Sequence, residues 1–107
     1  MRDMRADLLR GHLDGLLLAV LAEAPGHGYE LSRRLTRRSG GELAVNEGSL
    51  YPALHRLERA GLIESAWSAA EGRRRRIYRL TRAGRRAAGE SRQEWRAFAT
   101  AVERVLG

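Results

Sequence analysis

The sequence contains no cysteine and no lysine, and these two absences exclude several kinds of site. Without cysteine there can be no disulfide framework, no thiolate zinc site and no thiol nucleophile. Without lysine there can be no P-loop lysine and no Schiff base. We therefore expect neither a cofactor nor a bound metal.

Long hydrophobic runs are missing as well. The longest wholly apolar run, at 16–22, has seven residues, whereas a bilayer-spanning helix requires ~18 or more. The sequence shows no pattern of a cleavable signal peptide. We expect no membrane partner and a cytoplasmic location, with which the lack of cysteine is consistent.

Positive charge is abundant, and arginine alone carries it. The chain has 20 basic residues, all arginine, against 13 acidic ones, which gives a formal net charge of +7. The planar, forked guanidinium group matches phosphates and guanine edges, so this composition favours a polyanionic partner. The alternative is that the arginines only keep helix surfaces solvated.

The order of expected elements gives the fold class. With 107 residues the chain is one domain per subunit. Apolar periodicity predicts a buried helix over 8–23, a second from Tyr29 to the glycine pair 40–41, and a third from 46–49 to Gly61, with Pro52 early in it. Strands are expected over 62–67 and 73–80. The fold is therefore mainly α with a small β hairpin.

The last helix should begin at Arg82, after Thr81 as N-cap, and run almost to the end. About 25 helical residues span roughly 37 Å, which exceeds the small domain before it. Its apolar stripe is expected to pack against a second copy of the chain; the stripe consists of Ala88, Trp95, Phe98, Ala99, Val102 and Leu106. We divide the chain into a DNA-binding domain, 1–81, and a dimerisation helix, 82–107, within one structural unit.

The third helix has two different faces. Leu50, Leu54 and Leu57 recur at core spacing, while polar residues occupy the opposite side. Three helices followed by a hairpin is the order of a winged helix-turn-helix, whose third helix enters the major groove and whose hairpin touches the DNA backbone. The residues expected at DNA are Tyr29, Ser49, Tyr51, Pro52, His55, Arg56 and Arg59, with Arg74 and Arg75 from the wing.

Structural alternatives exist for several of these residues. Tyr51 would be a core-edge residue, and Arg56 would pair with Glu58 or Glu47 rather than bind guanine. Strand alternation lets at most about half of the four consecutive wing arginines approach one phosphate path. We expect Trp67, on the first wing strand, to lie in the core.

Several segments resemble the PadR-type transcriptional regulators, and the similarity extends from about Leu8 to Leu106. The segments are Gly-Tyr-Glu-Leu at 28–31, Glu-Gly-Ser-Leu-Tyr-Pro-Ala-Leu at 47–54, Arg-Leu-Glu-Arg-Ala-Gly-Leu-Ile at 56–63, and Arg-Arg-Arg-Ile-Tyr-Arg-Leu-Thr-Arg-Ala-Gly at 74–84. The resemblance implies a short-tailed family member. It also implies a homodimeric repressor of detoxification or efflux genes that binds an inverted-repeat operator and is released by a small molecule.

The same resemblance implies a site for a flat aromatic effector at the dimer interface, stacked on a tryptophan of the last helix. Trp95 occupies the matching place, and small residues opposite it would leave room for a ligand. The expected lining is Gly15, Ala19, Ala88, Arg92, Trp95 and Ala99. Arg92 indicates an anionic ligand, or it points to solvent. Alternatively, Trp95 only anchors the interface.

Three other functions compete with a sequence-specific regulator. An enzyme is disfavoured because His12, His27 and His55 lie far apart in the sequence, with no carboxylate at metal-ligand spacing. A nonspecific architectural DNA-binding protein would keep the basic surface but show little sequence preference. An adaptor that binds another protein through the last helix is not excluded by any sequence feature.

Overall fold

The computed structural model describes the backbone of residues 4–107 and the side chains of residues 8, 9 and 11–107. The elements are α1 (Met4–Glu23), β1 (Gly26–His27), α2 (Gly28–Arg38), α3 (Glu47–Arg59), β2 (Ile63–Ser68), a 3-10 turn (Ala70–Gly72), β3 (Arg75–Leu80) and α4 (Arg82–Leu106). The predicted fold, mainly α with a small β hairpin and a long last helix, is confirmed. Residues 1–3 of the predicted DNA-binding domain lie outside the described residues, and its boundary at 81 remains a prediction.

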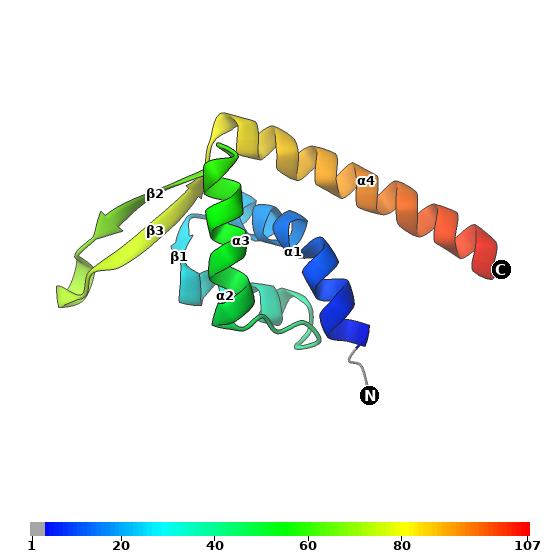
Figure 1. Ribbon diagram of the computed structural model, residues 1–107, viewed down its shortest axis with the longest axis horizontal. Coiled ribbons are helices and arrows are strands. Elements are labelled where there is room, and N and C mark those ends of the chain that lie inside the picture. Colours follow the sequence, from blue (N-terminus) through cyan, green and yellow to red (C-terminus); the bar gives the residue numbers. More distant parts are fainter. Residues whose placement is uncertain (1–3) are drawn as a thin grey trace.

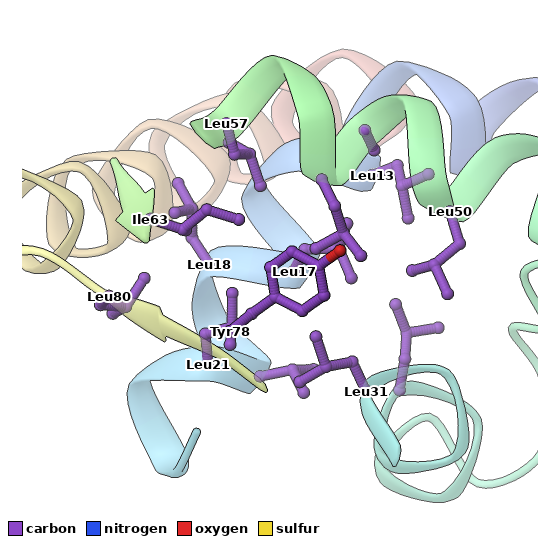
Figure 2. Packing of buried hydrophobic residues seen from close by; sticks show 14 of the residues in the cluster. Leu13, Leu17, Leu18, Leu21, Leu31, Leu50, Leu57, Ile63, Tyr78 and Leu80 are labelled. Atoms are coloured by element: carbon purple, nitrogen blue, oxygen red, sulfur yellow. The ribbon is translucent and has the colours of Figure 1, made fainter. Parts of the chain in front are cut away.

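The core forms where α1, α2 and α3 meet the sheet (Figure 2). Leu17 of α1 lies at its centre, beside Leu31 of α2 and the ring of Tyr78 from β3. The predicted inward stripe of α3 is confirmed, since the side chains of Leu50, Leu54 and Leu57 are all buried. Because these leucines fix one face of α3, its opposite face is left toward solvent.

The sheet has three antiparallel strands in the order β1-β3-β2, so the prediction of a two-stranded hairpin was incomplete. Gly26 and His27 pair with Tyr78 and Ile77 of β3. The segment after α1 contains proline and glycine, which indicate a loop, and its pairing with a strand about 50 residues away has no local sequence pattern. The wing strand β3 begins at Arg75 rather than at residue 73, since Ser68 pairs with Arg75.

Side-chain caps fix where the helices begin. Asn46 accepts from the backbone N–H of Ser49 at 2.9 Å, and Thr81 accepts from that of Gly84 at 3.0 Å; both caps agree with the prediction. His27 caps α2 in a reciprocal arrangement with Glu30, which the sequence pattern did not indicate. Pro52 is the sixth residue of α3, in its second turn, which agrees with the early place expected for it.

The two halves of α4 have different surroundings. In the first half, Gly84 and Ala88 are buried, and α4 packs against α1. In the second half the helix projects away from the rest of the chain (Figure 1), and the side chains of Trp95 and Phe98 are 52% and 57% exposed. None of the described helices has the length and apolar character needed to cross a membrane.

Trp67 does not belong to the core. Its side chain is 57% exposed on β2, so the expectation that it would be buried was wrong. The outer end of the hairpin extends beyond the helices (Figure 1), and Trp67 is the residue before the last of β2, opposite Arg76 of β3.

Candidate nucleic-acid interface

The outer face of α3 presents most of the residues that the sequence assigns to base reading. The side chains of Pro52, His55, Arg56 and Arg59 are exposed, and that of Ser49 is partly buried in the first turn. Residues at these spacings share one side of a helix because each turn contains about 3.6 residues. The structure thus brings these five residues together on one surface.

Arg56 is held by α1. Its Nη2 donates to Asp14 Oδ1 at 2.9 Å, and its Nε lies 3.5 Å from Asp14 Oδ2. The alternative pairing with Glu58 or Glu47 was therefore wrong in its partner, although right in placing a carboxylate there. Hydrogen bonding to Asp14 raises the pKa of Arg56 above its usual range, so the guanidinium is charged at any physiological pH. The contact with Asp14 uses the edge of the guanidinium group that carries Nε and Nη2, whereas Nη1, on the other edge, takes no part in it.

Tyr51 connects α3 to the start of α2. A methyl group built at Gly28 would come within 2.7 Å of the Tyr51 hydroxyl oxygen, so the phenol packs directly on the glycine backbone. The side chain still has 38% of its surface exposed. Tyr51 is thus both packed and accessible, which accommodates the core-edge interpretation and the DNA-contact interpretation together.

Tyr29 belongs to a small exposed cluster at the beginning of α2. Its ring is stacked parallel to that of His27, with 6.5 Å between the centroids. The guanidinium carbon of Arg33 lies 5.7 Å from the centroid of the Tyr29 ring. The first turn of α2 therefore presents an aromatic ring with a cation beside it, separate from the outer face of α3.

The consecutive arginines of the wing divide between its two faces. Arg75 Nη1 lies 2.9 Å from His27 Nε2, on the side where β1 joins the sheet. Arg74 and Arg76 lie over the ring of Trp67, with their guanidinium carbons 4.7 and 5.3 Å from its centroid. Strand alternation predicts this division, and it separates Arg74 from Arg75, the two wing residues expected at DNA.

Three residues with a place in this surface were missed: Asp14, Trp67 and Arg76. The register of the hairpin could have indicated two of them, because Trp67 and Arg76 are directly opposite each other across β2 and β3. Asp14 gave no such indication, since it pairs with a residue 42 positions later.

A groove of about 600 Å³ runs between α1 and the middle of α4, from Ala88 to Phe98. Five of the predicted ligand residues line it: Gly15, Ala19, Ala88, Arg92 and Trp95. Ala99 is not part of the lining. The ring of His12 meets that of Trp95 edge-on, with 5.0 Å between the centroids, so one face-to-edge contact of the indole is already occupied.

Gly15 lies against Ser91 of α4 beside the groove. A methyl group at this position would overlap the hydroxyl oxygen of Ser91 but would lie 3.6 Å from its Cβ, an ordinary contact. A methyl group there would therefore require rotation of the Ser91 hydroxyl rather than separation of the helices. Within the described part of the chain, no group of three or more histidine or acidic side chains is placed to hold a metal ion.

The chain is similar to transcriptional regulators in sequence and in structure. The model of the transcriptional regulator PadR-like family matches residues 17–90. A transcriptional regulator of Mycobacterium tuberculosis is 39% identical over 107 residues, which cover 100% of this chain and 91% of that protein.

Among solved structures, a transcriptional regulator from Clostridium thermocellum has a TM-score of 0.86 at 30% identity, with 94% of this chain and 99% of that chain covered. A PadR-like transcriptional regulator from Bacillus cereus has a TM-score of 0.80 at 35% identity, with 94% and 96% covered.

Proposed function

Because the chain belongs to the PadR-like family of transcriptional regulators, we propose that it is a homodimeric repressor that binds an inverted-repeat operator in the cytoplasm. The two copies of α3 enter successive major grooves, and the wing arginines contact the flanking phosphates. A small planar ligand in the groove between α1 and α4 releases the DNA.

The observation that carries this proposal is the two-sided character of α3. Its leucines are buried while His55, Arg56 and Arg59 stand exposed together. A helix anchored in this way can insert its polar face into a major groove without unfolding any core contact.

The exposed half of α4 supports the homodimer. Trp95, Phe98 and Leu106 present large apolar side chains to solvent, and Leu106 is 77% exposed. A second copy, related by a twofold axis, would bury the same stripe on both chains. Twofold symmetry in the protein also matches the symmetry of an inverted repeat.

The size and lining of the groove support the proposed ligand site. A volume of about 600 Å³ falls in the range that small-molecule sites occupy, roughly 300 to 1,000 Å³. The indole of Trp95 offers a surface for stacking, and Arg92 at the edge favours an anionic substituent. A partner chain packed on α4 would enclose the groove further.

The test is selection of bound sequences from random duplexes, together with the molar mass of the protein in solution. We expect an enriched palindrome and the mass of two chains. Arg56→Ala should relax base preference, because a guanidinium that donates to guanine distinguishes base pairs. Arg74→Ala should weaken binding to all duplexes to a similar degree, because phosphate contacts carry no sequence information.

Arg79→Ala is the matched control for loss of one positive charge. Arg79 is exposed on β3 and pairs across the strands with Glu64, on the face away from Trp67. It should leave both affinity and preference nearly unchanged. A selection that enriches no sequence, or a mass of one chain at working concentration, would contradict the proposal and would favour the nonspecific or the adaptor function.

A further inference from the structure

We propose that Trp67 is a positioning residue that holds Arg74 and Arg76 in place for phosphate contact and fixes the wing relative to α3. This inference rests on the proposed DNA-binding function. It assigns a role to a tryptophan that has no part in the core.

Two guanidinium groups lie over the indole of Trp67. The guanidinium carbon of Arg74 lies 4.7 Å from the ring centroid, and that of Arg76 lies 5.3 Å from it. Both distances fall within the ~6 Å at which a cation is attracted to the face of an indole, the strongest of the aromatic rings in this respect. An indole that is 57% exposed therefore has two cations as its neighbours.

Two hydrogen bonds join this group of side chains to α3. Arg76 Nε donates to Ser65 Oγ at 2.8 Å, and the Ser65 hydroxyl donates to Glu58 Oε2 on α3 at 2.7 Å. Ser65, Trp67 and Arg76 lie on one face of the hairpin, because Trp67 is opposite Arg76 and Ser65 is opposite Tyr78. The contacts run without interruption from the base-reading helix to the outer part of the wing.

Ordering of the arginines before binding explains why such an arrangement is useful. A free arginine loses rotamer freedom when it docks on a phosphate, which weakens binding by roughly two- to tenfold for each immobilised long side chain. Contact with Trp67 restricts both side chains in the free protein. Arg76 gives its Nε–H to Ser65, and the terminal N–H groups of both guanidinium groups can donate to a phosphate. Arg75, held at His27 on the other face, is outside this arrangement.

The test compares Trp67→Ala, Trp67→Phe and Arg74→Ala for binding to the selected operator over a range of salt concentrations. Trp67→Ala should weaken binding by about tenfold, because two arginines must now be ordered on binding. It should leave the slope of log affinity against log salt unchanged, because the phosphate contacts still form. Arg74→Ala should lower the magnitude of that slope by about 0.9 for each phosphate that Arg74 neutralises. Trp67→Phe should restore part of the affinity because a ring remains.

A spectroscopic measurement tests the same placement directly. The chain has two tryptophans, so Trp95→Phe leaves Trp67 as the one tryptophan fluorophore. Because Trp95 also belongs to the proposed dimer stripe, this variant is first shown to bind the operator with wild-type affinity, and operator DNA should then change its emission. Each variant is first checked for an unchanged melting temperature, which an exposed residue should not affect.

The inference is overturned by operator affinity of Trp67→Ala equal to that of the wild type, by a reduced salt slope in Trp67→Ala, or by emission that saturating DNA leaves unchanged. These results differ from failure of the proposed function, in which the wild-type protein itself binds no duplex specifically.

Discussion

Replacement of Gly84 by alanine should destabilise the protein, although alanine is the better helix former. Gly84 lies in the first turn of α4, where the helix leaves the sheet. A methyl group at this position would overlap the carbonyl oxygen of Leu62. That same oxygen accepts from the backbone N–H of Thr81 at 3.1 Å, so it cannot move without disturbing the cap of α4.

The magnitude follows from three contributions. Overpacking costs about 1 to 3 kcal/mol, and loss of the hydrogen bond between Thr81 and Leu62 costs about 1 kcal/mol more. The higher helix propensity of alanine offsets about 1 kcal/mol. The net free energy of unfolding should fall by about 2 kcal/mol, which lowers the melting temperature of a domain of this size by about 8 to 16 °C.

The assay is thermal unfolding followed by circular dichroism at one fixed protein concentration, because the proposed dimerisation would make the transition depend on concentration. Gly89→Ala is the matched control on the same helix. No atom of the described residues lies within 4 Å of a methyl group built there, so this change should raise stability by about 0.5 to 1 kcal/mol. Gly84→Ala with a melting temperature at or above that of the wild type would refute the reasoning.

Two further predictions concern the groove and the core. In a Trp67→Phe background, where Trp95 is the remaining tryptophan, an anionic planar dye should quench the emission. Arg92→Ala should weaken the binding of this dye but not of a cationic one. Unchanged emission with both dyes would contradict a ligand site at Trp95. Burial, assisted by Glu58 and opposed by Arg76, raises the pKa of the Tyr78 phenol above its ordinary value of 10.0. A pKa that is higher in the folded state means that stability is fully present below pH ~10 and falls as the pH rises through the folded pKa. Urea unfolding at increasing pH should therefore show a steeper loss for the wild type than for Tyr78→Phe, and equal slopes would rule out this contribution.

Sequence reasoning succeeded where the determinants are local. The leucine spacing of α3, the caps at Asn46 and Thr81, and the end of α3 at Gly61 each depend on residues within a few positions of one another. Gly61 has a φ of 77°, which glycine adopts without strain. Such features are fixed by backbone geometry and by neighbouring side chains, so a sequence predicts them.

The features that were missed or wrongly placed depend on distant parts of the chain. β1 exists only because β3 supplies a partner for Gly26 and His27. Trp67 is apolar and lies on a strand, which suggests burial, but the outer end of the hairpin extends beyond the helices (Figure 1). Arg56 was correctly placed on an exposed face, yet its carboxylate partner on α1 depends on how α1 crosses α3.

The crossing of α1 has a consequence for communication within the protein. Asp14 and Gly15 are adjacent residues of one rigid helix: the first holds Arg56, and the second lines the groove. A ligand bound against Gly15 that rotates or shifts this helix would also displace the carboxylate of Asp14, by a comparable amount. A shift of α1 caused by a ligand in the groove would thus reach the carboxylate that holds Arg56 through α1 alone, without other side chains between them.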